Sequence, residues 1–406
     1  MLLSAILMAA AAPALHFDLR PDARPEAGRV AVAADKPYQP GGFGYEPERR
    51  GREFFFSAAV PEGNYRVTVR FGDRRAASRT TVKAEARRLM LRDIATRPGQ
   101  YVTASFVVNV RTAALAPPPA NAPGGSAVRL KPREASSYSW DDKLTLEFLG
   151  DPRVAAIDIE PVTVPTVFLA GDSTVTDQRA EPAASWGQML PALFGPDIAV
   201  ANHAESGETL KSFVTELRFD KLLSQVKPGD WLLIQFGHND QKAEWPQTYV
   251  DPRITYPAWL RTYIAEARRR GAHPVLVTSP ERRNFEQGRI RPTLADYAEA
   301  MRRVAHEEQV PLIDLQPATI ALYEALGPDQ APLLFNDGGK DKTHHDNKGA
   351  WLLARAVVAG IAETVPDLAE HLRPEARRFD PAHPPALDTI AIAPSIASSS
   401  VRPAGS

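Results

Sequence analysis

The stretch TVFLAGDSTVTDQ, residues 166–178, decides how the second half of the chain is interpreted. Its apolar run stops abruptly at Gly171-Asp172-Ser173, and polar residues follow. A short apolar run that ends in turn residues is typical of a buried strand. Ser173 then either caps a following helix, a position that serine and aspartate favour, or presents its hydroxyl at the end of the strand. Taken alone, Gly-Asp-Ser favours the helix cap.

The chain after residue 165 alternates strand-like and helix-like segments. The apolar, strand-like runs lie at residues 166–170, 198–201, 231–236, 274–278 and 311–315. Helical patterns lie between and after them, for example at residues 256–270, 293–308 and 349–363. Nearly continuous apolar strands joined by helices predict a parallel sheet that helices cover on both faces. We therefore expect an α/β domain over residues 165–378.

The first part of the chain has a different pattern. From residue 16 to residue 161, apolar and polar residues alternate in short runs such as NYRVTVRFG (64–72) and DKLTLEFLG (142–150). This period of two, interrupted by Pro and Gly turns, predicts an antiparallel β-sandwich domain. Phe43, Tyr45 and residues 54–56 either fill its core, which is the commoner role, or form a platform for sugars.

The two ends of the chain have biased compositions. MLLSAILMAAAAPAL, residues 1–15, has the apolar length and the small residues of an export signal, although no Lys or Arg precedes it. It is too short for a membrane-spanning helix, and a buried strand is the alternative. We therefore expect a secreted or periplasmic protein. Residues 379–406 are rich in Pro, Ala and Ser, which predicts a disordered tail.

The overall composition excludes several classes of function. The chain has 406 residues, more than one core usually needs, which agrees with two domains. Its net charge of −1 gives no electrostatic basis for binding nucleic acid or an anionic membrane. It contains no cysteine, which excludes thiol catalysis, disulfides and cysteine-bound zinc. The sequence leaves the oligomeric state open.

Polar clusters follow the predicted strands of the second domain and precede its last helix. They are Gly171-Asp172-Ser173, Asn202 with Gly207, Gly237 with Asn239, and Asp341 with His344. Ligands of open parallel sheets bind beyond the carboxyl ends of the strands, so we expect these clusters to converge on one rim. Each is ambiguous alone, because Gly207 is more often a turn residue and Asn239 more often part of an Asx-turn.

Together the clusters fit nucleophilic catalysis. A serine hydroxyl needs a base, and His344 is the candidate for Ser173. Asp341, three residues earlier, is placed to orient the imidazole and to stabilise its protonated form. The Ser173 and Gly207 N–H groups and the Asn239 amide are candidates for an oxyanion hole. The alternatives are a solvated polar loop or, with His345 and Asp346 added, a metal site.

These blocks resemble the four sequence blocks of the SGNH (GDSL-type) hydrolase superfamily, over about half of the chain. The resemblance implies a flavodoxin-like three-layer α/β/α fold, with Ser173 as nucleophile, Gly207 and Asn239 as oxyanion donors, and Asp341 and His344 as the catalytic pair. It implies no metal or organic cofactor.

The segments FLAGDSTVTDQ, SWGQMLP, IQFGHNDQK and DKTHHDNKGAWLLARAV resemble the rhamnogalacturonan acetylesterase branch of that superfamily. The resemblance implies a serine esterase that removes acetyl groups from pectic polysaccharide, its expected partner molecule. An esterase for acetylated xylan or another ester, and an inactive carbohydrate-binding protein, are the alternatives. Trp186 and His238 are candidate substrate contacts, although a core role for Trp186 is equally compatible and a structural hydrogen bond is the commoner role for a residue such as His238. Glu205 and Glu208 depart from the branch and predict a more acidic rim.

Overall fold

A computed structural model describes residues 13–20, 26–399, 401 and 403. Most of the predicted export signal at residues 1–15 lies outside these residues. In the part of the chain that is described, no helix has both the length and the apolar character needed to cross a bilayer.

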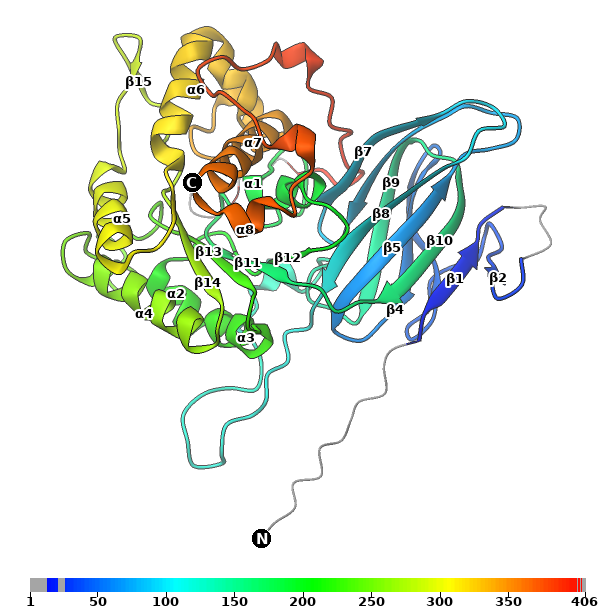
Figure 1. The fold of residues 1–406 in the computed structure, drawn as a ribbon, viewed down its shortest axis with the longest axis horizontal. Coiled ribbons are helices and arrows are strands. Elements are labelled where there is room, and N and C mark those ends of the chain that lie inside the picture. The colour runs from blue at the N-terminus through cyan, green and yellow to red at the C-terminus, as the bar shows by residue number, and fades with distance from the viewer. Residues whose placement is uncertain (1–12, 21–25, 400, 402, 404–406) are drawn as a thin grey trace.

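The first domain is a sandwich of two five-stranded sheets (Figure 1). One sheet has the order β2-β1-β10-β5-β8, with β2 Val30–Ala31, β1 Leu15–Asp18, β10 Val154–Pro161, β5 Gly63–Phe71 and β8 Val102–Val110. The other has the order β3-β4-β9-β6-β7, with β3 Phe43–Arg50, β4 Glu53–Ala59, β9 Lys143–Asp151, β6 Ser78–Ala84 and β7 Arg88–Thr96. All neighbouring strands are antiparallel except β1 and β2.

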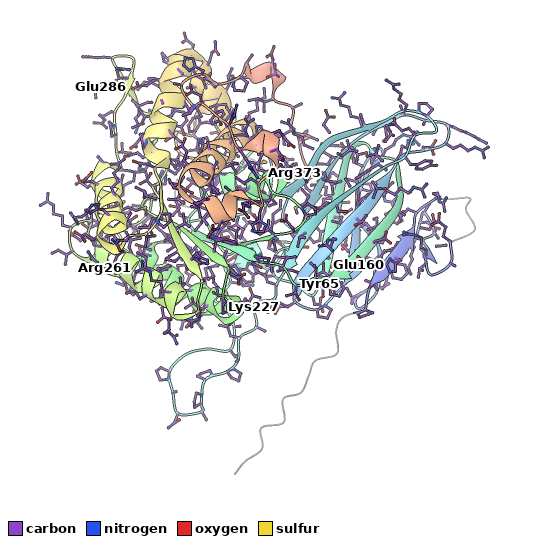
Figure 2. The ribbon with its side chains drawn as sticks, in the orientation of Figure 1. Tyr65, Glu160, Lys227, Arg261, Glu286 and Arg373 are labelled. Atoms are coloured by element: carbon purple, nitrogen blue, oxygen red, sulfur yellow. The ribbon has the colours of Figure 1, made fainter. Side chains whose placement is uncertain are left out.

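Alternating side chains of these strands form the core between the two sheets. Along β5 every second residue from Tyr65 to Phe71 is buried, as expected of a strand with one face on the core. Tyr45 and Phe56 belong to that core and contact each other edge to face. The core role of these aromatic residues is therefore the one observed. Tyr65 and Glu160, on the neighbouring strands β5 and β10, lie close together where the chain leaves the sandwich (Figure 2).

The second domain contains the predicted parallel sheet. Its order is β12-β11-β13-β14-β17, with β12 Ala199–Asn202, β11 Thr166–Gly171, β13 Trp231–Gln235, β14 His273–Val277 and β17 Leu312–Ile313. Every neighbouring pair is parallel. The chain leaves β11 for β12 on one side and returns to β13 on the other. In such a sheet the ligand site lies at this reversal, beyond the carboxyl end of the first strand. Here Ser173 follows that strand.

Helices cover both faces of the sheet (Figure 1). The main ones are α1 Trp186–Met189, α2 Leu210–Thr215, α3 Arg218–Gln225, α4 Thr255–Arg269, α5 Ala295–Glu308, α6 Leu315–Gln330, α7 Asn347–Thr364 and α8 Pro366–Ala369. Alternate β11 residues serve two separate cores. Val167 and Leu169 pack with α1, α6 and α7, whereas Phe168 and Ala170 pack with α2 to α5. The predicted α/β/α fold is confirmed.

The expectation of a disordered tail from residue 379 is wrong for the residues that are described up to 399. Ile390 is 5% exposed and Ser395 is 2% exposed. The Ser395 backbone N–H donates to Glu181 Oε1 at 2.7 Å, and its hydroxyl donates to Glu147 Oε2 at 2.7 Å. The segment thus packs on both domains. Its composition gave no sign of this, because its partners are buried carboxylates on distant elements.

Candidate active site

Ser173 lies in a turn directly after β11. The Asp172 carboxylate accepts hydrogen bonds from the Thr174 N–H and hydroxyl, both at 2.9 Å, and the Asp172 carbonyl accepts from the Val175 N–H at 3.1 Å. Burial raises the pKa of Asp172. No helix begins here: α1 starts at Trp186 behind a Ser185 cap. The predicted helix start at Ser173 is therefore wrong, and an Asx-type turn presents the serine instead.

A continuous chain of hydrogen bonds joins Ser173 to Asp341. The Ser173 Oγ lies 2.8 Å from His344 Nε2, and His344 Nδ1 lies 2.9 Å from Asp341 Oδ2. All three residues are at most 3% exposed. Ser173 and His344 are separated by 171 positions in the sequence, so the fold alone brings them together. This is the arrangement of nucleophile, base and orienting acid that acyl transfer requires.

The protonation states follow from the contacts of Asp341. Burial alone would raise the pKa of Asp341, but the hydrogen bond to His344, with the backbone N–H groups of His344 and Thr343, holds that pKa well below its usual value. An ionised Asp341 can only accept, so Nδ1 of His344 carries a proton and donates it. With that proton on Nδ1, Nε2 is the ring nitrogen that accepts the hydrogen bond from the Ser173 hydroxyl.

Gly207 lies in a tight turn beside the nucleophile. The Glu208 N–H donates to the Glu205 carbonyl at 3.3 Å, and Gly207 between them has φ +87°. A positive φ at this third turn position is the one a type II turn requires, which suits glycine. The Gln178 amide connects this turn to the nucleophile, because its Nε2 lies 2.8 Å from the Ser173 carbonyl and 3.5 Å from Ser206 Oγ.

Asn239 follows β13 and reaches the same turn. Its Nδ2 donates to the Glu208 carbonyl at 3.0 Å. An amide nitrogen carries two hydrogens, so one donor remains after this bond. Gly237 is needed for close packing here, because a Cβ on it would lie 2.9 Å from Ser279 Oγ. The four sequence blocks therefore converge as expected.

The two candidate substrate contacts are both buried. Trp186 is 1% exposed, its Nε1 donates to Gln235 Oε1 at 2.9 Å, and it packs in the core with Val167 and Leu353. The core role of Trp186 is therefore the one observed. The His238 side chain is also buried, and burial, with the nearby charge of Arg282, lowers the pKa of its imidazole well below the usual value.

His345 does not join His344 in a metal site. Its Nε2 lies 2.7 Å from the Tyr323 hydroxyl, so the two imidazoles make contacts with different elements. Burial, with the nearby charge of His344, lowers the pKa of His345 to about 3. Across the described residues, no three His, Cys, Asp or Glu side chains are grouped to hold a metal ion.

The rim is not acidic, contrary to the expectation from Glu205 and Glu208. Glu208 is fully buried and forms an ion pair with Lys131, and Glu205 lies 2.7 Å from Arg133 Nη2. Both cations come from the sandwich side of the chain, more than 70 positions upstream. Sequence reasoning missed them because they belong to a segment with no catalytic pattern of its own.

The sandwich domain also supports the loop that follows Ser173. Arg87 Nη1 donates to the Gln178 carbonyl at 3.1 Å and to the Ala183 carbonyl at 2.8 Å. Arg88 Nε donates to Asp177 Oδ2 at 2.6 Å. These buried arginines lie at the β6–β7 turn, so this turn of the first domain holds one wall of the site in the second.

A family model and two relatives each match about half of this chain. The model of the GDSL-like lipase/acylhydrolase family matches residues 169–352. Rhamnogalacturonan acetylesterase RhgT of Bacillus subtilis (strain 168) is 44% identical over 220 residues, which are 51% of this chain and 93% of RhgT. The probable rhamnogalacturonan acetylesterase YesY of the same organism is 39% identical over 209 residues, 51% of this chain and 96% of YesY.

A crystal structure of the Bacillus subtilis protein YxiM is similar over a larger share of the chain. It is 24% identical, has a TM-score of 0.49, and the match covers 86% of this chain and 98% of YxiM. The family match, and the identity to RhgT across nearly all of that protein, together show that this chain belongs to the GDSL-like lipase/acylhydrolase family and is a carboxylic ester hydrolase.

Proposed function

We propose that this protein is a serine esterase that removes O-acetyl groups from a pectic polysaccharide. The observation that carries the proposal is the buried chain from Ser173 through His344 to Asp341, with distances of 2.8 and 2.9 Å. The names of the two Bacillus relatives, both rhamnogalacturonan acetylesterases, support the acetyl group and the pectic substrate. The predicted export signal fits a polymeric substrate outside the cell.

The acylation half-reaction starts at the Ser173 hydroxyl. Oγ attacks the acetyl carbonyl carbon while its proton passes to His344 Nε2, 2.8 Å away. The carbonyl oxygen becomes an oxyanion, which accepts hydrogen bonds from the N–H groups of Ser173 and Gly207 and from the remaining Asn239 donor. The bond to the sugar oxygen then breaks, and His344 returns the proton to that oxygen as the deacetylated sugar leaves.

The deacylation half-reaction uses the same groups in the reverse roles. A water molecule gives a proton to His344 Nε2 and attacks the acetyl carbon of the ester on Ser173. The oxyanion formed by this attack accepts hydrogen bonds from the same three donors. Its collapse releases acetate, and the proton on His344 returns to the Ser173 oxygen. Throughout both halves, the negative charge of Asp341 stabilises the imidazolium that forms 2.9 Å away.

Cationic side chains around the site support an anionic sugar backbone. Arg179 is half-buried and interacts electrostatically with Glu205 and Arg133. Arg282 donates to the His238 carbonyl at 3.3 Å, and half-buried Lys242 lies close enough to feel the charge of Arg282. A galacturonate carboxylate would find charge-assisted donors here. A neutral xylan backbone would not use them.

The test is acetate release from a matched panel of polysaccharides. Purified full-length protein is incubated with acetylated rhamnogalacturonan, acetylated homogalacturonan and acetylated xylan, and acetate is measured with time. We expect the highest kcat/KM on rhamnogalacturonan and no release from any of them by Ser173→Ala. Equal or faster release from xylan would contradict the pectic part of the proposal. Release by Ser173→Ala would contradict the mechanism.

A further inference from the structure

One peptide group next to the nucleophile is held by cations from the other domain. The Ser206 carbonyl accepts hydrogen bonds from Lys131 Nζ at 3.1 Å and from Arg133 Nη2 at 2.6 Å. Both side chains belong to the 3₁₀ turn around Pro132–Glu134, which precedes β9 of the sandwich. Ser206 is buried, so its carbonyl needs donors from the protein, and these two cations supply them.

The same peptide group carries the N–H of Gly207. In a trans peptide the C=O and the N–H point in opposite directions. Whatever fixes the direction of the Ser206 carbonyl therefore also fixes the direction of the Gly207 N–H. This N–H is one of the three oxyanion donors in the proposed function.

Gly207 does not fix this direction by itself. Type I and type II turns differ mainly in the orientation of their central peptide, which here joins Ser206 to Gly207. Glycine adopts positive and negative φ with similar ease, so it permits both orientations. No atom lies within 4 Å of the position that a Gly207 Cβ would occupy, so local packing places no restraint on that side. The restraint comes from the far side of the peptide, through its carbonyl.

We propose that Lys131 and Arg133 are positioning residues of the esterase, which hold the Ser206–Gly207 peptide so that the Gly207 N–H faces the developing oxyanion. The sandwich domain is then part of the catalytic apparatus and not only an appendage. The two cations also polarise the peptide, because hydrogen bonds in a chain strengthen one another at low dielectric. The inference rests on the proposed function.

The segment that carries these cations is itself fixed. Glu134 Oε2 accepts from the Lys131 N–H at 2.8 Å, while Glu134 Oε1 accepts from Arg218 at 3.0 Å and from Trp140 Nε1 at 3.1 Å. Burial alone would raise the pKa of Glu134, but the charge and hydrogen bonds of Arg218, together with the Lys131 backbone N–H, hold that pKa below its usual value. The ion pairs of Lys131 with Glu208 and of Arg133 with Glu205 offset the charges of these two buried carboxylates.

The experiment compares three variants of the full chain on p-nitrophenyl acetate, an uncharged substrate that is too small to need a sugar site. Arg133→Ala removes the shorter of the two carbonyl bonds. Arg133→Lys restores a cationic donor. Glu205→Gln is the matched control, because it removes the Arg133 ion pair and leaves the bond to Ser206. The concentration of competent sites is titrated for each variant with an organophosphonate, so that partial unfolding does not enter kcat.

We expect a specific pattern in the kinetic constants. Loss of one oxyanion donor typically lowers kcat by about 10²–10³-fold. Since Lys131 still holds the carbonyl, Arg133→Ala should lower kcat by about tenfold or more, with KM within about threefold of wild type. Arg133→Lys should recover most of kcat, and Glu205→Gln should stay within about twofold of wild type.

Other outcomes overturn the inference. If Arg133→Ala keeps kcat on p-nitrophenyl acetate and only raises KM on acetylated rhamnogalacturonan, Arg133 is a substrate contact. If Glu205→Gln loses as much as Arg133→Ala, the ion pair matters and not the carbonyl bond. Failure of the proposed function itself is distinguishable, because wild type would then show no turnover that depends on Ser173.

Discussion

Asp341→Asn tests the proposed catalytic chain most directly. The Asp341 Oδ1 atom accepts from the Thr343 N–H at 2.8 Å and from the His344 N–H at 3.0 Å. An asparagine of the same shape must keep its amide oxygen at these two donors. Its NH₂ group then occupies the position of Oδ2, which lies 2.9 Å from His344 Nδ1.

The expected loss of kcat follows from the His344 tautomer that the Asp341→Asn substitution imposes. An NH₂ group can only donate to Nδ1, so the ring proton moves to Nε2, where Ser173 needs an acceptor. The general base is lost while the geometry is kept. In serine hydrolases with this arrangement, the exchange lowers kcat by about 10⁴-fold. At about 1.36 kcal/mol for each tenfold, this is about 5.4 kcal/mol of transition-state stabilisation. KM should change little, because no atom that contacts substrate has moved.

The assay is the hydrolysis of p-nitrophenyl acetate near neutral pH, with the melting temperature measured in parallel. Asp346→Asn is the matched control, since Asp346 lies in the same segment but caps α7, where its Oδ1 accepts from the Gly349 N–H at 2.9 Å. Asparagine is an equally good cap, so this variant should retain activity. If folded Asp341→Asn kept kcat within about tenfold of wild type, Asp341 would not be the orienting acid.

Three further variants probe the domain contact, the core and the turn. Burial opposes ionisation of Glu181, but Arg87 and Lys83 lower its pKa from 4.5 to about 2. The contribution of ionised Glu181 to the free energy of unfolding is therefore complete above pH 4.5 and is lost as the pH falls through 2. Denaturant unfolding of Glu181→Gln should show about 3 kcal/mol less stability at pH 7, and the difference from wild type should shrink below pH 4.5. Trp186→Phe should lower the free energy of unfolding by about 1–2 kcal/mol through the lost bond to Gln235 and leave KM unchanged, whereas a raised KM would return Trp186 to the substrate site. Gly207→Ala should fold, because the added Cβ meets open space. An alanine at φ +87° is strained by about 1–2 kcal/mol, which favours the other orientation of the Ser206–Gly207 peptide, so kcat should fall at constant KM.

Much of the second domain was predictable because its signals are local. Strand β11 and helix α5 lie within two residues of the segments expected from apolar runs and periodicity. Ser173 and His344 could be proposed as a pair because Ser173 follows the first parallel strand and His344 precedes the last long helix, where the topology collects polar side chains at one edge of the sheet. The contact between them, across 171 positions, could only be expected from the convergence of the four blocks.

The parts that were missed depend on contacts between distant segments. Whether Glu205 and Glu208 form an acidic rim depends on Lys131 and Arg133, whose own sequence looks like ordinary polar surface. The helix expected at Ser173 is absent because Asp172 satisfies the backbone of the turn by itself, which a residue preference cannot distinguish from a cap. Burial of the segment around Ser395 arises from carboxylates in both domains.

The Ser395 contacts have a consequence for the order in which the molecule can be assembled. The fully buried Lys83 ammonium donates to Glu181 at 3.3 Å and to the Ser395 hydroxyl at 2.8 Å, and Glu181 also receives the Ser395 N–H from 214 positions away. During synthesis residue 395 is added after every strand of the three five-stranded sheets. Until Ser395 is in place, Lys83 and Glu181 each lack one of their hydrogen-bond partners. The junction beside the loop after Ser173 is therefore completed only when this late segment joins it.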